Sequence, residues 1–181
     1  KFVNSDKLAV FFQSAKKNNK DILKRKKKWI TFVGKLNSAK GYDVFAKAIK
    51  NILNKYPDWK AKIIGDEKRE KITLNHKNAN ILGFLNHQKV LNIFKETSIA
   101  VACSRWEEPF GRTSLEASAS GCAVIITNKG GLPETVTNAK ILNKLNVKNL
   151  EKTIKLLIEN KKLRSNLQNL SLRNFYLTHE F

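Results

Sequence analysis

The chain has 181 residues, a formal net charge of +20 and a hydrophobic fraction of 41%. That fraction is typical of a folded domain and argues against intrinsic disorder, and the length suffices for one domain with a buried core. No apolar run approaches the roughly 20 residues that span a bilayer, so we expect no transmembrane helix. The N-terminus, Lys1-Phe2-Val3-Asn4, is not a signal peptide and the chain contains no Met, so we expect it to be a piece of a longer protein.

Two parts can be distinguished along the chain. Residues 1–28 are expected to be a residual linker or edge segment, with Leu8–Phe12 a candidate strand and Ser14–Lys28 a polar connection. Over residues 29–181, short β-rich runs alternate with helical patterns, and we expect one domain. The predicted strands are Trp29–Val33, Lys60–Ile64, Ala79–Phe84, Ser98–Cys103, Ala123–Thr127 and Ala139–Leu142. The predicted helices are Tyr42–Lys55, His87–Glu96, Thr113–Ser120, Val147–Glu159 and Lys162–Tyr176.

Strands that alternate with helices form right-handed βαβ units, which place the strands in one parallel sheet with helices on both faces. The expected fold class is therefore α/β, a doubly wound Rossmann-like parallel sheet. In such sheets ligands bind at the carboxyl ends of the strands, where helix N-termini point at them. Functional residues are therefore sought in the loops that follow Val33, Ile64, Phe84, Cys103 and Thr127.

The two cysteines, Cys103 and Cys122, have no spacing typical of a disulfide framework or a zinc site. Their apolar surroundings indicate small buried residues, and a reducing cytoplasm is the natural compartment. The three histidines, His76, His87 and His179, are scattered along the chain, so we expect no metal site.

The basic residues gather in one compact run, Lys24–Lys28 (KRKKK). A strongly basic chain attracts polyanions such as nucleic acid, an anionic membrane or a diphosphate. A solvated face explains the same run equally well. Aromatic residues are not interleaved with the lysines and no nucleic-acid-binding spacing occurs, so we expect no nucleic acid partner.

The loop after the first predicted strand, Gly34–Gly41 (GKLNSAKG), carries Lys35 and Lys40. Its backbone amides and the two lysines could converge on an anion. It has neither the P-loop order nor the glycine fingerprint of dinucleotide-binding domains. By itself it is equally typical of a turn with two exposed lysines.

The segment Arg105–Glu116 (RWEEPFGRTSLE) follows the fourth predicted strand. Thr113 lies in the first turn of the next predicted helix, where free amides could hold a phosphate. Glu108 and Glu116 are eight residues apart, which puts one carboxylate beside that anion site and the other about a turn deeper. A carboxylate that accepts two vicinal hydroxyl donors is a common way to hold a ribose or a hexose. The alternative is that Glu116 caps neighbouring backbone while Glu107 and Glu108 are solvated.

A third loop, Lys129–Glu134 (KGGLPE), follows the fifth predicted strand. Two glycines before Pro133 and Glu134 mark a tight loop with proline in the first turn of a helix. Such a loop exposes amides to a ligand, although a plain turn has the same sequence.

In this order, the three loops resemble those of the C-terminal donor-binding domain of retaining GT-B glycosyltransferases of family 4, also called group 1. The likeness rests on Gly34–Gly41 with its two lysines, on Glu108-x7-Glu116 and on Gly130-Gly131-x-Pro133-Glu134, and it runs from about Trp29 to Tyr176. The resemblance implies an enzyme of two Rossmann-like domains that transfers a sugar from a nucleotide diphosphate sugar with retention at the anomeric carbon. This chain is then one half of the enzyme, and the missing N-terminal domain, which holds the acceptor, is an expected partner.

The resemblance also implies roles for individual residues. Lys35 and Lys40 contact the diphosphate and, together with Glu108, are the expected catalytic residues. Glu108 binds hydroxyls of the donor sugar, Glu116 binds those of the ribose, and Leu85 lies near the base. The other expected donor-binding residues, which act chiefly through backbone amides, are Gly34, Phe110, Gly111, Arg112 and Thr113. Two cations opposite the leaving diphosphate stabilise its charge without a metal, so we expect no cofactor.

Four positions depart from the family pattern, and two of them, Cys103 and Cys122, do not touch the expected chemistry. Lys35 stands where Arg is commoner, which loses a bidentate fork and keeps the charge. Asn86 stands where the family often has Gly, which leaves base recognition open.

The sequence therefore predicts the donor half of a hexosyltransferase that acts on a glycan or lipid-linked acceptor in cell-envelope polysaccharide synthesis. We expect a cytoplasmic protein, peripheral on the inner membrane face if the basic run binds anionic lipid. The alternative is a non-catalytic Rossmann module that binds a polyanion or a nucleotide and uses its two glutamates structurally. Competition by a nucleotide diphosphate sugar, as against nucleic acid or anionic lipid alone, distinguishes the two.

Overall fold

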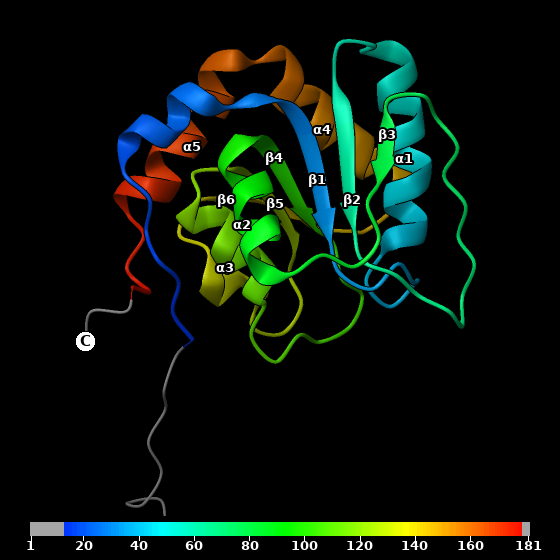
Figure 1. Ribbon diagram of the computed structural model, residues 1–181, viewed down its shortest axis with the longest axis horizontal. Helices are drawn as coiled ribbons and strands as arrows, with labels where there is room; N and C mark the ends of the chain where they lie inside the picture. The colour runs from blue at the N-terminus through cyan, green and yellow to red at the C-terminus, as the bar shows by residue number, and fades with distance from the viewer. Residues whose placement is uncertain (1–12, 179–181) are drawn as a thin grey trace, which may run out of the picture.

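The computed structural model describes residues 13–178, in which a parallel sheet is covered by helices on both faces (Figure 1). Its strands are β1 Lys27–Val33, β2 Lys60–Ile64, β3 Ala79–Ile81, β4 Thr97–Ala102, β5 Ala123–Thr127 and β6 Ala139–Leu142. Its α-helices are α1 Tyr42–Lys55, α2 His87–Glu96, α3 Arg112–Ala119, α4 Val147–Glu159 and α5 Lys161–Arg173. Two short 3-10 helices, η2 Lys20–Arg25 and η3 Leu132–Thr135, complete the described elements. The candidate strand Leu8–Phe12 lies outside the described residues.

The strand order is β3-β2-β1-β4-β5-β6, and every neighbouring pair is parallel. The chain builds the sheet outward from β1 to one edge, returns to β4 beside β1, and then builds to the other edge. The reversal between β1 and β4 opens a crevice at the carboxyl ends of these strands. The predicted doubly wound sheet is confirmed.

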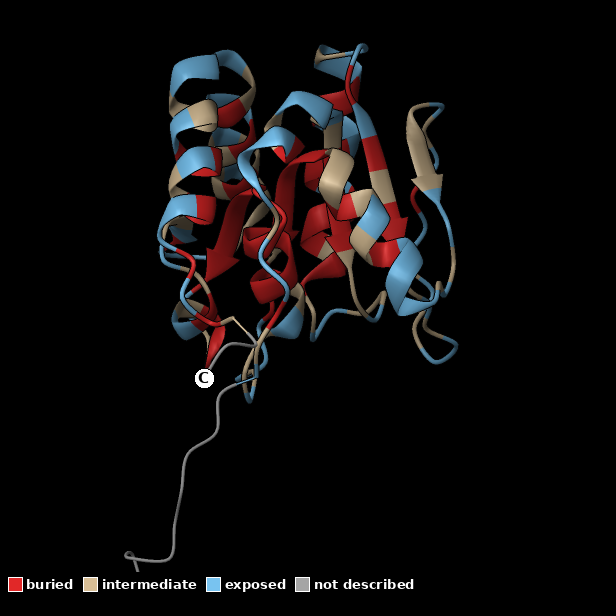
Figure 2. Cartoon of the chain, turned by 60° about the vertical axis from the view of Figure 1, so that its left-hand side comes forward, coloured by how far each residue is buried: buried red, intermediate tan, exposed pale blue. Residues whose placement is uncertain are grey.

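The central strands are buried on both faces, which explains their continuous apolar sequences. In β5, Ala123 and Ile125 pack with the cluster formed by α1 and α4, whereas Val124 and Ile126 pack with α2 and α3. All five residues of β5 are buried, and Figure 2 shows the buried strands at the centre of the molecule beneath exposed helix faces. The sheet is therefore a rigid support for the loops at its edge.

Several boundaries differ from the predicted ones. β3 ends at Ile81 and not at Phe84, because Gly83 has φ +64° and turns the chain away from the extended conformation. Helix α5 ends at Arg173 and not at Tyr176, because Phe175 and Leu177 turn back to pack beside Ala15 in a third apolar cluster. α3 begins at Arg112, one residue earlier than predicted, and β1 begins at Lys27, two residues earlier.

The segment predicted as a polar connection, Ser14–Lys28, is packed onto the domain, so that prediction is wrong for its inner face. Ala15 and Ile22 are buried, and the amide of Ala15 donates to the carbonyl of Leu177 at 3.0 Å. Figure 1 shows this blue segment running beside the red helix α5. Helix η2 places Ile22 against the domain while its charged residues face outward.

Candidate functional site

Two adjoining cavities open at the carboxyl ends of β1 and β4. The smaller, of about 80 Å³, is lined chiefly by the ends of the two strands and by the predicted residues Gly34, Lys40, Glu108, Gly111, Arg112 and Thr113. The larger, of about 420 Å³, is lined by Gly34, Lys35, Ile64, Gly65, Asp66, Phe84, Leu85, His87, Arg112, Thr113 and Glu116, among others. Both cavities share Val33, Gly34, Arg112 and Thr113, so they adjoin, and together we call them the cleft.

Nine of the ten predicted site residues therefore line one cleft. The exception is Phe110, whose ring packs against the apolar cluster around Leu115 and Phe175. Any part that Phe110 takes in binding must come from its backbone. A separate cavity of about 480 Å³ lies between β6 and α4, and none of the predicted residues lines it.

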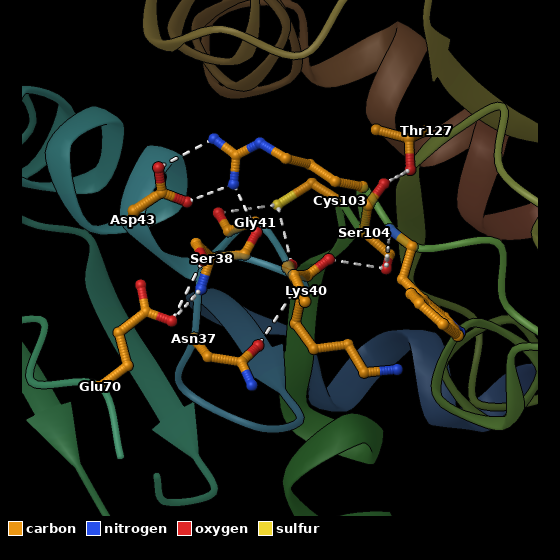
Figure 3. A network of polar contacts seen from close by, with 12 residues as sticks. Asn37, Ser38, Lys40, Gly41, Asp43, Glu70, Cys103, Ser104 and Thr127 are labelled. Carbon is orange, nitrogen blue, oxygen red and sulfur yellow. Dashed lines mark hydrogen bonds and ion pairs between the residues drawn. The ribbon is translucent and has the colours of Figure 1, made fainter. Parts of the chain in front are cut away.

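The loop Gly34–Gly41 is held by contacts on both sides. Glu70 accepts hydrogen bonds from the amide and the hydroxyl of Ser38 at 2.9 and 3.1 Å (Figure 3). Asn37 accepts from the amide of Lys40 at 3.0 Å and donates to Glu67 at 3.0 Å. These bonds fix the backbone between the two lysines, so the lysines extend from a rigid loop.

Arg105 ties the same loop to the end of β4. Its guanidinium donates to both carboxylate oxygens of Asp43 at 2.6 and 2.8 Å and also to the carbonyl of Ser38. The hydrogen bonds from Arg105 hold the pKa of the Asp43 carboxyl below its ordinary value. The hydroxyl of Ser104 and the amide of Arg105 both donate to the carbonyl of Ala39. The first two predicted loops are thus one hydrogen-bonded unit.

The third loop is bound to the second in a similar way. Glu107 accepts hydrogen bonds from Lys129 Nζ and from the amide of Gly130, each at 2.6 Å, and these lower its pKa. The amide of Gly131 donates to the carbonyl of Glu108 at 2.7 Å. The glycine loop therefore supports the backbone of Glu108, a role that its sequence did not indicate.

The two lysines differ in their surroundings. Lys40 Nζ lies 2.5 and 2.7 Å from the two carboxylate oxygens of Glu108, whose side chain is only 13% exposed. Lys35 is exposed and forms no ion pair or hydrogen bond within residues 13–178. The cleft therefore holds one paired and one unpaired ammonium group.

Glu116 is a nearly buried carboxylate, 6% exposed, at the wall of the larger cavity. Its Oε1 lies 2.7 Å from Arg112 Nε and 2.8 Å from His87 Nε2. Glu116 was predicted from the sequence, whereas His87 stood out only as one of three scattered histidines. The contact spans 29 residues and depends on how α2 lies against α3, so only the position of His87 at a helix start beside the cleft could have indicated it.

Two of the three helices that begin at the cleft lack side-chain caps. α1 and α3 begin after Gly41 and Gly111, and neither N-cap forms a side-chain hydrogen bond. In contrast, α2, α4 and α5 are each capped by an asparagine: Asn86, Asn146 and Asn160. The first-turn amides of α3 are thus free to bind an anion, as predicted for Thr113.

The loop expected near the base contains one exposed and one half-buried apolar side chain. Phe84 is 79% exposed and Leu85 is half-buried, and both line the larger cavity. Asn86, at the position where the family often has Gly, accepts from the amide of Lys89 and begins α2. The Asn86 side chain therefore caps the N-terminus of α2.

Both cysteines are buried and free, which confirms their predicted role as small buried residues. Burial raises the pKa of the Cys103 thiol to about 12. Within residues 13–178, no group of three or more histidine, cysteine, aspartate or glutamate side chains is arranged to hold a metal ion. In the same part of the chain, no helix is long and apolar enough to span a membrane.

The basic run Lys24–Lys28 is largely paired. Lys24 lies 2.7 Å from Asp21, Lys27 lies 2.8 Å from Glu96, and Lys28 contacts Asp58. Lys26 points inward and donates to the carbonyls of Phe94 and Ser120 at 3.0 and 2.7 Å. The run therefore presents less unpaired charge than its sequence indicates.

The cleft thus combines groups suited to an anion with groups suited to hydroxyls. Lysine ammonium groups and free helix amides bind phosphate oxygens, and ionised carboxylates accept from sugar hydroxyls. The fold and these loops define a Rossmann-like domain of a GT-B glycosyltransferase. The family described as glycosyl transferases group 1 matches residues 13–171, and the chain belongs to this family.

Curated relatives agree with this assignment. The chain is 29% identical to spore coat protein SA of Bacillus subtilis over 127 residues, which are 63% of this chain and 34% of that protein. It is 31% identical to the lipopolysaccharide core biosynthesis mannosyltransferase LpsB of Rhizobium meliloti over 121 residues, or 61% of this chain and 34% of that protein. The chain spans about a third of the length of the curated relatives it matches.

Solved structures show the same fold. The C-terminal domain of a glycosyl transferase group 1 family protein from Francisella tularensis superposes with a TM-score of 0.71 and 26% identity, over 90% of this chain and 92% of that one. HepE of Anabaena, solved with UDP and glucose, has a TM-score of 0.68 and 21% identity, over 89% of this chain and 50% of that one.

Proposed function

We propose that this chain is the donor-binding domain of a retaining glycosyltransferase that transfers a hexosyl group from a nucleotide diphosphate sugar. The observation that carries the proposal is the cleft of two adjoining cavities at the β1–β4 reversal. It brings Lys35, Lys40 and the free amides of α3 together with two carboxylates, Glu108 and Glu116. Cations for a diphosphate and acceptors for sugar hydroxyls are thus adjacent.

The linings of the two cavities suit different parts of a nucleotide sugar. The larger cavity, with Glu116 and the apolar Phe84 and Leu85, suits a nucleoside, whose ribose hydroxyls would donate to Glu116. The smaller cavity, with Lys40 and Glu108, suits hydroxyls of the transferred sugar. The diphosphate would lie where the cavities meet, beside Gly34 and Thr113.

Lys35 and Lys40 would act on the reaction by stabilising negative charge on the departing nucleoside diphosphate. Glu108 would bind hydroxyls of the transferred sugar, and its ion pair with Lys40 would open to admit the ligand. This assignment requires no metal or other cofactor.

The acceptor would bind to the N-terminal domain of the complete protein, which is a proposed partner. We propose a glycan or lipid-linked acceptor in cell-envelope polysaccharide synthesis, because relatives include a mannosyltransferase named for lipopolysaccharide core biosynthesis. We also propose a cytoplasmic location. Attachment to an anionic membrane stays a prediction, and the carboxylate partners of Lys24, Lys27 and Lys28 weigh against this run as its main contact.

Since orientation of the reactants can account for roughly 7–11 kcal/mol of a barrier, half of an enzyme cleft should bind its donor without measurable turnover. The test is calorimetry with UDP, GDP and ADP, together with an assay for sugar transfer from the matching nucleotide sugars. We expect at least one diphosphate to bind and no transfer to occur. Transfer by the isolated chain would contradict the division of labour between the domains.

Glu116→Ala tests the placement of the nucleoside. The variant should lose the preference for a ribonucleoside diphosphate over its 2′-deoxy counterpart, because the acceptor of the ribose hydroxyls is gone. Binding of RNA or anionic vesicles without any nucleoside diphosphate binding would favour the alternative, a non-catalytic polyanion-binding module.

A further inference from the structure

Two side chains from different elements converge on one oxygen of Glu116. Arg112 Nε and His87 Nε2 lie 2.7 and 2.8 Å from Oε1, and Oε2 accepts no hydrogen bond from the described residues. A carboxylate has about four acceptor positions, so Oε2 keeps its full capacity to accept. The unused oxygen belongs to a side chain that is nearly buried and lines the larger cavity.

The two donors do not constrain the carboxylate in the same way. Arg112 lies one turn before Glu116 on the same helix, and its side chain is 62% exposed. His87 reaches the same oxygen from the first residue of α2, a different helix, and its side chain is 56% exposed. The terminal torsion of a glutamate is broad, so donors from two directions on one oxygen select one orientation of the group.

The same three side chains lie where two surface cavities meet, and the His87 side chain is 56% exposed. His87, Arg112 and Glu116 line the 420 Å³ cavity and also a second cavity of about 340 Å³, which lies between α2, α3 and the segment around Ala15. The charged groups on that second side are Lys16 and Lys95. Removal of the imidazole would leave Oε1 of Glu116 with Arg112 as its one donor among the described residues.

We propose that His87 is a positioning residue for ribose recognition, holding Glu116 through Oε1 so that Oε2 faces the nucleoside hydroxyls. This inference rests on the proposed function, since it takes the larger cavity to be the nucleoside site. An ionised carboxylate can only accept, so the His87 ring must donate from Nε2. In the neutral ring, Nδ1 then carries no hydrogen, and the structure specifies one tautomer.

The test is the ratio of affinities for UDP and 2′-deoxy-UDP, measured by calorimetry, with the GDP and ADP pairs as further probes. His87→Ala should reduce the ratio by about fivefold or more while the 2′-deoxy affinity stays within about twofold. His87→Gln keeps an N–H donor of similar reach and should restore most of the ratio. His87→Leu keeps a side chain of similar bulk but has no hydrogen-bond donor, so it should behave like His87→Ala.

The outcomes separate this inference from the proposed function. If the wild-type chain binds no nucleoside diphosphate, or if Glu116→Ala keeps the ratio, the proposed function fails. If Glu116→Ala loses the ratio and His87→Ala keeps it, only the role of His87 fails. Restoration by His87→Leu would show that the ring acts by filling space, which also overturns the inference. Imidazole nitrogen NMR of the unmutated chain should show the Nε2–H tautomer, and the Nδ1–H tautomer would contradict it.

Discussion

Replacing Lys40 by alanine should weaken both folding and diphosphate binding, whereas replacing Lys35 should weaken binding alone. Lys40 holds both oxygens of Glu108, and the two side chains are 32% and 13% exposed. Lys35 is exposed and has no partner in the described part of the chain. The two lysines lie on one loop, so each variant is the control for the other.

The expected magnitudes follow from the exposure of the pair. An exposed ion pair contributes up to about 1 kcal/mol, and breaking a fully buried one costs about 3–5 kcal/mol. A pair of intermediate exposure should contribute about 2 kcal/mol, which lowers the Tm of a domain of this size by about 4–8 °C. Lys35→Ala should stay within about 0.5 kcal/mol of the wild type. Each variant should lose about 10- to 150-fold in diphosphate affinity, because each removes a charge-assisted hydrogen bond.

Thermal unfolding followed by circular dichroism measures the first effect, and calorimetry with UDP and uridine measures the second. Uridine affinity should hardly change in either variant. The combination Lys40→Ala with Glu108→Gln should recover part of the stability, because no unpaired carboxylate is left, and should not recover the affinity. Equal Tm losses in Lys35→Ala and Lys40→Ala, or unchanged diphosphate affinity in both, would refute this reasoning.

Three further predictions concern the support of the site, the buried thiols and the basic run. Gly130→Ala should destabilise the fold by more than Gly83→Ala in urea unfolding, because a Cβ at Gly130 would meet Glu108 backbone atoms at 2.2 and 2.5 Å, whereas Gly83 has open space. Equal losses would contradict the close packing of the Lys129–Glu134 loop against the backbone of Glu108. Above pH 9 the Cys103 thiol ionises in the unfolded chain but not in the folded one, where its pKa is about 12. The free energy of unfolding should therefore fall with pH by up to about 1.4 kcal/mol per pH unit more steeply in the wild type than in Cys103→Ala. Parallel plots of unfolding free energy against pH would contradict this. Replacing Lys24, Lys27 and Lys28 by glutamine should change co-sedimentation with anionic vesicles little at physiological salt, and its loss would show that the run binds membrane despite its pairing.

Much of the fold could be predicted because each element has a strong local pattern. The apolar residues of α1 recur at helical spacing and those of β5 form a continuous run, and these local patterns predicted the observed boundaries. The predictions failed where packing against distant parts of the chain determines the local structure. Phe175 falls within the predicted helix Lys162–Tyr176, yet it leaves α5 because it packs with Leu177 in an apolar cluster beside Ala15.

The site could be predicted as a set of loops and not as a set of contacts. Glycines, lysines and glutamates after predicted strands identified the cleft, since a parallel sheet brings its carboxyl ends together. The pairing of Lys40 with Glu108 spans 68 residues, and that of His87 with Glu116 spans 29. Such pairs depend on the register of neighbouring strands and on helix packing, which no local pattern specifies.

The most direct test of the central claim is a map of amide chemical shifts in the chain with and without the nucleoside diphosphate that binds it. The cleft at the β1–β4 reversal predicts shifts in the amides of residues 33–41, 84–87 and 108–116. The 480 Å³ cavity between β6 and α4 should show none. Shifts confined to Ile141, Lys152 and Leu156 would place the ligand there and contradict the account.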